Sequence, residues 1–196
     1  NVTQQEFASY NAGYVASLNN TYTRNLAKAK SLMEEAGYKD GFAVTFPRFA
    51  GTPQTQVDFI GDQLAQLGIT VKWDSYATIG DYFIALHTPK YPAYRMTLQR
   101  DANDLQLIDF KLGRDASWND SGYGDATSDK LIALAKSSTG ATQKKALQDL
   151  NKYITAQAWS CPLIEKMAAF GYNKTKVVVA PHAGNVLPYL LEFQPK

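Results

Sequence analysis

The central part of the chain alternates between helix-like and strand-like patterns, and this alternation restricts the fold more than any other feature of the sequence. Apolar residues recur every three or four positions, as on one face of a helix, in 25–37, 55–67 and 79–86. Short stretches that suit strands lie at 42–46, 69–73 and 93–98. A strand–helix–strand–helix–strand order is typical of a sheet with parallel strands and crossover helices. The sequence therefore predicts an α/β fold.

The residues at the ends of these segments agree with the assignment. Asn25 can cap the first helix, and Gly37 stands where a left-handed residue commonly ends a helix. Gly68 closes the second helix in the same way. Pro47 is expected to end the first strand, because it has no N–H to give to a sheet.

The second half of the chain is predicted to be mainly helical. Further helices are expected at 105–112, 128–136 and 142–157, with a loop at 113–124 between the first two. Strand-like stretches follow at 163–164, 167–172 and 190–193. A short helix at 6–14 is expected within an otherwise connecting N-terminal segment.

The composition excludes several classes of protein. With 45% hydrophobic residues among 196, the chain has enough apolar surface to fold, so intrinsic disorder is excluded. Its 20 basic and 18 acidic residues are spread along the chain, which does not indicate a nucleic-acid partner or a polybasic membrane role. The single cysteine, Cys161, excludes an internal disulfide framework and a multi-cysteine zinc site. No run of about 18 apolar residues is present that could span a bilayer.

The sequence carries no strong catalytic signal. It has no phosphate-binding loop, no GxGxxG motif and no GxSxG nucleophile elbow. His87 and His182 lie far apart without nearby ligand-type residues, and Cys161 has no basic neighbour that would lower the pKa of its thiol. The chain is therefore predicted to bind a ligand rather than to catalyse a reaction, with no cofactor, no catalytic residue and no metal site.

Two segments have the composition of a binding site. Residues 97–104 (TLQRDAND) directly follow the third predicted strand, and ligands of open α/β sheets bind at the carboxyl ends of strands. The alternative is a solvated turn, with Asp104 capping the next helix. Residues 117–124 (SWNDSGYG) place Trp118 and Tyr123 around small polar residues, as in recognition loops, or only shape a turn.

Several motifs, in order along the chain, resemble a known family. Residues 28–42 (KAKSLMEEAGYKDGF) are similar to a helix and turn of the peptide- and nickel-type solute-binding proteins of bacterial ABC importers, solute-binding protein family 5. Residues 62–71 (DQLAQLGITV) resemble the helix-to-strand step of these proteins, and residues 119–123 (NDSGY) resemble a loop that precedes a helix. The region after Pro162 matches more loosely.

This resemblance implies the type II fold of periplasmic binding proteins, in which two lobes close on a ligand like a hinged clamp. Residues 24–176 are then expected to form the C-terminal lobe, with a mixed, mostly parallel sheet flanked by helices. Residues 1–23 would be a connecting or hinge segment, and residues 177–196 a returning tail.

The resemblance also implies ligand contacts. Asp101 falls where peptide-binding members place the carboxylate that meets the amino terminus of the ligand, and Asp104 falls on a second, mainly structural aspartate. Leu98 stands where the family has tryptophan, and Arg100 adds a charge that can pair with Asp101 or meet an acidic ligand group. The predicted ligand-binding residues are Leu98, Arg100, Asp101, Asn103, Asn119 and Tyr123.

The leading interpretation is the substrate-binding lobe of an extracytoplasmic solute receptor, either periplasmic or a cell-surface lipoprotein whose anchor lies outside this chain. Its expected partners are an oligopeptide or a related small solute, the membrane subunits of an ABC permease and the N-terminal lobe of the same receptor. No nucleic acid is expected among them. The alternative is a receptor-like lobe that acts as an interaction module in signalling or adhesion, without a transported solute.

Overall fold

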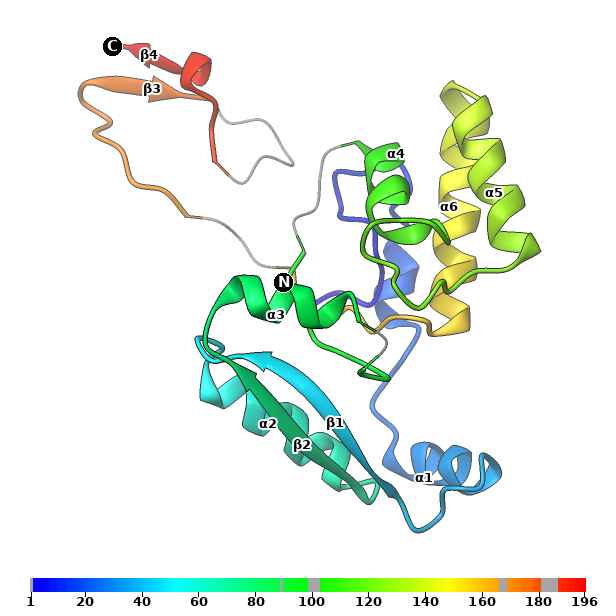
Figure 1. Cartoon of the computed structure of the whole chain (residues 1–196). Helices are drawn as coiled ribbons and strands as arrows, with labels where there is room; N and C mark the ends of the chain where they lie inside the picture. Colours follow the sequence, from blue (N-terminus) through cyan, green and yellow to red (C-terminus); the bar gives the residue numbers. More distant parts are fainter. Residues whose placement is uncertain (1, 89, 99–102, 166–168, 181–186) are drawn as a thin grey trace. The chain divides into compact units, whose positions relative to one another are not determined.

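A computed structural model of the chain describes residues 2–88, 90–98, 103–165, 169–180 and 187–196 (Figure 1). The chain forms two compact units. The first, here called the sheet unit, comprises Thr23–Thr97. The second, here called the helical unit, comprises Asn1–Tyr22 and Leu98–Lys196.

The sheet unit contains a parallel pair of strands. Strand β1 (Phe42–Phe49) pairs with β2 (Ile69–Tyr76), in a register that begins at Phe42 and Ile69 and ends at Phe49 and Tyr76. Helix α2 (Gln54–Ala65) connects the strands and packs on β2, and helix α3 (Ile79–Leu86) follows β2 and contacts both strands (Figure 1). The α/β fold predicted from the sequence is confirmed.

Two glycines bring the starts of these strands together. Gly41 has φ +74° and Gly68 has φ +78°, a left-handed conformation that side chains other than glycine rarely adopt. A Cβ atom on Gly41 would lie 2.0 Å from the carbonyl oxygen of Gly68. The parallel register therefore depends on the absence of a side chain at Gly41.

The core of the sheet unit is small. Its buried apolar side chains are Val57, Ile69, Tyr82, Ala85, Leu86 and Tyr91. Helix α1 (Leu26–Glu35) contributes no buried residue, although it begins and ends as predicted. The Asn25 side chain accepts a hydrogen bond from the Lys28 backbone N–H, and Gly37 has φ +84°.

The helical unit has a larger core. It contains α4 (Asp104–Leu107), a π-helix η2 (Ile108–Leu112), α5 (Ala126–Ser137) and α6 (Gly140–Gln157), and α5 lies along α6 in Figure 1. One buried cluster joins these helices to the N-terminal segment; its members are Phe7, Leu107, Ile108, Leu112, Ala135, Ala146, Leu147, Leu150 and Ile154. All the predicted helices of this region are present, but 105–112 is α-helical only in its first part.

The N-terminal segment is held by polar side chains rather than by a helix at 6–14, so that prediction was wrong. Asn11 Oδ1 accepts a hydrogen bond from the Ala8 N–H at 2.9 Å, and such local bonds compete with helix formation. The Nδ2 of Asn151 on α6 donates to Gln5 Oε1 at 2.8 Å. The segment's own helical element is a 3-10 helix, η1, at Ala16–Asn20.

The C-terminal region contains a second pair of strands. Strand β3 (Val177–Val179) pairs antiparallel with β4 (Phe193–Pro195), and η3 (Leu190–Glu192) is a 3-10 turn before β4. The strand predicted at 190–193 therefore starts only at Phe193. The strand predicted at 163–164 is reduced to an isolated antiparallel bridge between Ile164 and Val2. Part of the strand predicted at 167–172 lies outside the described residues.

Two further strand predictions need correction. Strand β1 runs through the buried Pro47 to Phe49 instead of ending before the proline. A proline fits there because β1 pairs with β2 on one side, and an edge strand can lack one N–H on its other side. Residues 93–98 form no strand, because the Arg95 carbonyl accepts a hydrogen bond from the Tyr82 hydroxyl instead of entering a ladder.

Among the described residues, no helix has both the length and the hydropathy that a membrane span requires.

Candidate functional site

A small hollow opens next to the last residues of β1 in the sheet unit. It is lined by Pro47, Arg48, Thr52, Gln56, Val57, Ile60, Trp73, Tyr82 and Arg95. Its volume of about 10 Å³ is about the space of one water molecule. Because crevices at the carboxyl ends of parallel strands are where open α/β sheets bind ligands, this hollow is the candidate site in the sheet unit.

Arg48, near the end of β1, is held by two neutral partners. Its Nε donates to Ser75 Oγ at 2.9 Å, and its Nη1 donates to Gln54 Oε1 at 2.9 Å. Gln54 in turn donates to Asp58 Oδ1 at 2.7 Å, one turn further along α2. The guanidinium group of Arg48 is thus oriented by a hydroxyl and an amide. The Asp58 carboxylate bonds to that amide and not to the guanidinium group.

Arg95 reaches the same hollow from the segment after α3. Its Nη2 donates to Gln56 Oε1 at 2.6 Å, while its backbone carbonyl accepts from the Tyr82 hydroxyl. Burial raises the pKa of Tyr82, and the positive charge of Arg95 opposes that rise. Within the described part of the chain, neither Arg48 nor Arg95 forms an ion pair with a carboxylate.

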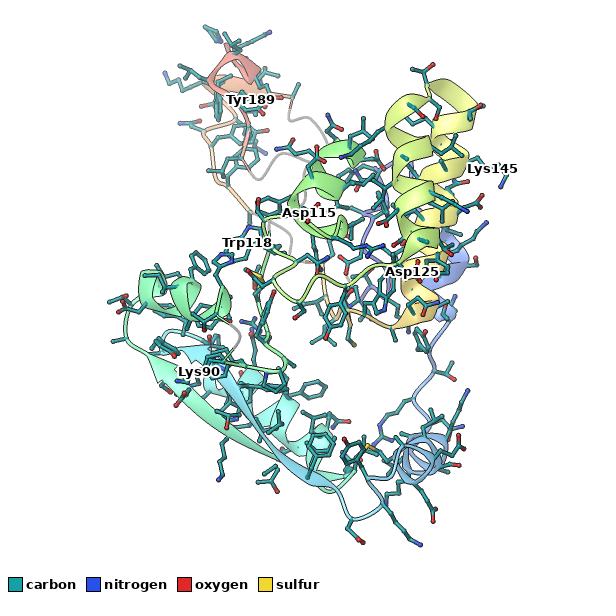
Figure 2. The ribbon with its side chains drawn as sticks, turned by 45° about the vertical axis from the view of Figure 1, so that its right-hand side comes forward. Lys90, Asp115, Trp118, Asp125, Lys145 and Tyr189 are labelled. Carbon is teal, nitrogen blue, oxygen red and sulfur yellow. The ribbon has the colours of Figure 1, made fainter. Side chains whose placement is uncertain are left out.

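A second, open groove of about 460 Å³ lies beside the end of β2 and α3. It is lined by Ser75, Tyr76, Ala77, Asp81, Ile84, Ala85, Thr88 and Lys90, the last of which is labelled in Figure 2. The polar groups at this end of β2 are bonded to one another. Lys90 Nζ lies 2.8 Å from Asp74 Oδ2, and the Tyr91 hydroxyl lies 2.6 Å from that oxygen and from the Tyr76 hydroxyl.

This network shifts the pKa values of its members. Burial and the bond to Asp74 raise the pKa of Tyr91 to about 12, and the bond to Lys90 lowers the pKa of Asp74. The arrangement attaches the segment after α3 to β2. Since the lysine charge is matched by the aspartate, the groove presents less uncompensated charge than the hollow.

The residues predicted after the third strand have local roles where the structure describes them. Arg100 and Asp101 lie outside the described residues, and Leu98 is half-buried in irregular backbone. Asn103 caps α4, accepting a hydrogen bond from the Leu105 N–H at 2.9 Å. Asp104 accepts hydrogen bonds from the N–H groups of Ala12 and Gly13, at 3.2 and 2.8 Å, and is structural as the resemblance implied.

The loop at 113–124 is braced by one of its own residues. The Asn119 amide donates to the carbonyls of Gly113 and Tyr123 and accepts from the Tyr123 N–H, at 2.9, 2.8 and 3.0 Å. Trp118, labelled in Figure 2, packs against Phe110 with ring centroids 6.0 Å apart. Tyr123 is exposed. The structure joins Asn119 and Tyr123 to each other, and ligand contact at these two residues and at Asn103 stays a prediction.

The start of α5 is fastened to α6 by an aspartate. Asp125 caps α5 by accepting from the N–H groups of Thr127 and Ser128, both at 2.9 Å, and it accepts from the Tyr153 hydroxyl (Figure 2 labels Asp125). The Tyr153 bond is the main cause that lowers the pKa of Asp125. The role of Asp125 is therefore structural.

Three residues were considered for catalysis, namely Cys161, His87 and His182. Cys161 is exposed rather than buried, and desolvation together with the Glu6 carboxylate raises the pKa of its thiol, which disfavours the nucleophilic thiolate. His87 ends α3, and His182 lies outside the described residues. No group of three or more potential metal-ligating side chains occurs in the ranges that the structure describes.

The sequence analysis did not single out Arg48 or Arg95. Arg48 follows the first predicted strand by two residues, so the rule that pointed to residues 97–104 would also have found it. Arg95 could not have been found in this way, because it lies inside the stretch that was taken for the third strand.

No protein-family model matches the chain, and no curated protein sequence matches it either. Solved structures do match. HbpA2 from Haemophilus parasuis is 21% identical, over 83% of this chain and 34% of that protein, with a TM-score of 0.74. The periplasmic binding protein DppA from Helicobacter pylori, in complex with the peptide STSA, is 21% identical over 83% of this chain and 33% of its own, with a TM-score of 0.66.

A third match is AgaA from A. tumefaciens R10 in complex with agropinic acid. It is 19% identical over 83% of this chain and 34% of that protein, with a TM-score of 0.72. The chain thus spans about a third of the length of these proteins. The chain has the fold of part of a periplasmic solute-binding protein, as the sequence motifs indicated.

Proposed function

We propose that the chain is the substrate-binding lobe of an extracytoplasmic receptor that delivers a small solute, such as an oligopeptide, to an ABC importer. The observation that carries this proposal is the fold, which is shared over 83% of the chain with binding proteins such as the peptide complex of DppA. The partners would be the N-terminal lobe of the same receptor and the membrane subunits of the permease. The receptor would act in the periplasm or at the cell surface.

The local chemistry supports binding rather than catalysis. The hollow at the end of β1 presents N–H donors of Arg48 and Arg95 beside the aromatic side chains of Trp73 and Tyr82. A few placed polar groups on a largely apolar wall are typical of small-molecule sites. In a receptor with two lobes, closure of the lobes would supply the remaining contacts and exclude water, so one lobe alone should bind weakly.

The residues after Leu98 supply a direct test in the intact receptor. Asp101 is the residue that would meet a cationic amino terminus of a peptide, since a carboxylate and an ammonium form a charge-assisted hydrogen bond. Asp101→Asn should therefore weaken binding of ligands that have a free amino group by about tenfold or more, equivalent to about 1.4 kcal/mol. Equal affinity of the variant and the wild-type receptor would remove Asp101 from the proposed site.

The mass and location of the native protein test the proposal as a whole. Source cells are fractionated and blotted with an antibody raised against this chain, whose own mass is 21.7 kDa. A much heavier band in the envelope or periplasmic fraction supports a receptor lobe. A band at the mass of the chain itself would contradict it and favour the interaction module.

A further inference from the structure

We propose that Asn173, in the turn before β3, is a site of N-linked glycosylation, and that the exposed rings of Phe170 and Tyr172 cover one face of the first sugar. The glycan would come from a lipid-linked oligosaccharide pyrophosphate, transferred by a membrane-bound enzyme. This inference rests on the extracytoplasmic location in the proposed function, because such glycans are carried on surface loops of secreted proteins.

The chain has four Asn-x-Ser/Thr triplets, the acceptor sequence for N-linked glycans. They begin at Asn1, Asn19, Asn119 and Asn173, and none has proline at its middle position. Asn1 lies outside the described residues. The structure therefore allows the other three asparagines to be compared.

Two of these asparagines use their side chains for internal bonds. Asn19 is half-buried, and its Oδ1 accepts hydrogen bonds from the Gln4 N–H at 3.2 Å and from Gln5 Nε2 at 3.1 Å. The Asn19 Nδ2 donates to the Tyr14 hydroxyl at 3.3 Å. The Asn119 Nδ2 donates to two carbonyls of its own loop. A glycan on either nitrogen would replace an N–H by a bulky group and disrupt these bonds, which makes both sites poor acceptors.

Asn173 differs because its amide nitrogen is open to solvent. The residue is exposed, and its Oδ1 accepts hydrogen bonds from the Thr175 N–H at 3.0 Å and from the Thr175 hydroxyl at 2.7 Å. Its backbone carbonyl accepts from the N–H groups of Lys176 and Val177, at 3.0 and 3.1 Å. Among the described residues, none accepts a hydrogen bond from the Asn173 Nδ2. The threonine of the triplet thus orients the amide through its oxygen and leaves the nitrogen accessible.

The transfer is a substitution at the anomeric carbon of the first sugar. The Asn173 nitrogen forms a bond to this carbon, the bond from the carbon to the pyrophosphate oxygen breaks, and the amide gives up one proton to a base of the transferase. The lipid pyrophosphate leaves with the electron pair of the broken bond. The modified side chain keeps its Oδ1, so both bonds from Thr175 can remain.

Two aromatic rings close to Asn173 in the chain supply a surface for the sugar. Phe170 and Tyr172 stack with ring centroids 5.7 Å apart, and Phe170 also contacts Phe193 of β4, with centroids 6.5 Å apart. Although these contacts hold the rings, Phe170 is 36% and Tyr172 is 46% exposed. The C–H face of a sugar that packs on such a ring removes apolar surface of both from water. Residues one and three positions before Asn173 lie within about 10 Å of it along the chain, which a sugar on its side chain can reach.

Mass spectrometry of the native protein, purified from source cells, tests the inference. Trypsin releases Asn173 in the peptide of residues 167–174. This peptide should carry the added mass of whole sugar residues, and the peptides that contain Asn19 and Asn119 should not. A peptide 167–174 that occurs only in unmodified form would overturn the inference, as would sugar on Asn19 or Asn119 in its place.

Matched variants expressed in the same cells test the triplet itself. Thr175→Ala removes the hydroxyl of the acceptor sequence and should abolish the added mass, whereas Thr175→Ser retains a hydroxyl and should keep it. Ser121→Ala makes the corresponding change in the Asn119 triplet and should leave the added mass unchanged. Added mass that persists in Thr175→Ala, or that is lost in Ser121→Ala, contradicts the assignment to Asn173.

Thermal unfolding tests the aromatic contact. Enzymatic removal of the glycan should lower the Tm of the wild-type protein by about 2–4 °C and should lower that of Tyr172→Ala by less, because this variant has lost one face of the contact. Equal decreases in both proteins would exclude the contact between the sugar and Tyr172.

Failure of this inference differs from failure of the proposed function. A heavy band in the envelope fraction whose peptide 167–174 is unmodified means that the glycan is wrong but the receptor stands. The Thr175→Ala variant gives the mass of the polypeptide without the glycan, and a band of 21.7 kDa for it outside the envelope means that the receptor function is wrong.

Discussion

The two units of the molecule hold their described arginines with different partners. In the helical unit, Glu6 is buried and bonded by both carboxylate oxygens to Lys111 at 2.8 Å. Asp109 pairs with Lys136 and Arg114 with Asp129 in the same unit. In the sheet unit, the arginines of the hollow meet amides instead. The sheet unit does have carboxylate pairs at two lysines, Lys39 with Glu34 and Lys90 with Asp74, so the contrast concerns the arginines of the two units.

The packing of the units differs in the same direction. The helical unit has a continuous cluster in which Phe7, Ile108 and Leu150 are fully buried. In the sheet unit, Leu32 on α1, Phe59 on α2 and Ile84 on α3 are all more than half exposed. The helical unit also has exposed apolar side chains outside this cluster, such as Leu190 and Leu191, so the difference lies in the two cores.

The largest predicted effect tests the difference in packing. Leu150→Ala, in the core of the helical unit, should lower the free energy of unfolding by about 4 kcal/mol, because it leaves a cavity in a closed cluster. The matched change Leu64→Ala, at a half-buried site on α2, should cost about 1 kcal/mol. Urea denaturation measures both, and equal costs would contradict the comparison.

The next effect tests the buried ion pair. Glu6→Gln should destabilise the chain by about 3 kcal/mol, since it leaves the Lys111 ammonium partly buried without its carboxylate. As a control, Asp109→Asn removes one partner of an exposed pair and should cost less than about 1 kcal/mol. If the two variants melt alike, the Glu6 pair is not a structural element of the helical unit.

A third prediction concerns the strand register of the sheet unit. Gly41→Ala should cost about 2 kcal/mol or more, because a Cβ there meets the Gly68 carbonyl and requires a left-handed conformation. Gly61→Ala is the control: it lies within α2 with no atom near its added Cβ, and it should stabilise the helix by about 0.5–1 kcal/mol. Amide hydrogen exchange should show lower protection of the β1 and β2 amides in Gly41→Ala than in the wild-type chain. Unchanged protection would contradict the role of Gly41 in the strand register.

A smaller effect on the free energy of unfolding is expected when a carboxylate is placed next to Arg95. Gln56→Glu should change the free energy of unfolding by no more than about 1 kcal/mol, because a half-exposed ion pair contributes little. Urea denaturation measures this change, which should be smaller than that of Glu6→Gln. A large loss of stability in Gln56→Glu would mean that Gln56 is a structural residue of the sheet unit.

The smallest effect concerns alkaline pH. The pKa of Tyr91 is about 12 in the folded chain and about 10 in an unfolded one. The folded state therefore binds the proton of the Tyr91 hydroxyl more tightly than the unfolded state does. The contribution of this group to the free energy of unfolding is complete below pH 10 and is lost as the pH rises toward 12. Tyr91→Phe should flatten this part of the stability profile, and an unchanged slope would exclude Tyr91 as its source.

The elements that could be predicted from the sequence are those decided by neighbouring residues. Asn25 and Gly37 set the ends of α1 through local bonds and backbone conformation, and α3 occupies 79–86 as its apolar pattern indicated. The segments that could not be predicted depend on distant side chains. Residues 93–98 are not a strand because Tyr82 takes the Arg95 carbonyl, and residues 6–14 are not a helix because polar bonds to α6 and within the segment hold them.

The same distinction applies to the site. Asp104 is structural, as the family resemblance implied, but it does not cap the next helix as its place in the sequence suggested, because Asn103 is the cap of α4. The pairing of Arg95 with Gln56 spans 39 residues, and no local pattern reveals it. Nor could the sequence show that the charges of Arg48 and Arg95 share one hollow, because that depends on how α2 and α3 pack on the sheet.

The most direct test of the contrast between the units is an NMR titration of this chain with acid, observing the Nε–H signals of its arginines in a single sample. The signal of Arg114, whose Nε donates to Asp129, should shift as carboxylates are protonated around pH 4, while those of Arg48 and Arg95, held by glutamines, stay in place. Signals of Arg48 and Arg95 that shift along the same curve as that of Arg114 would contradict the account.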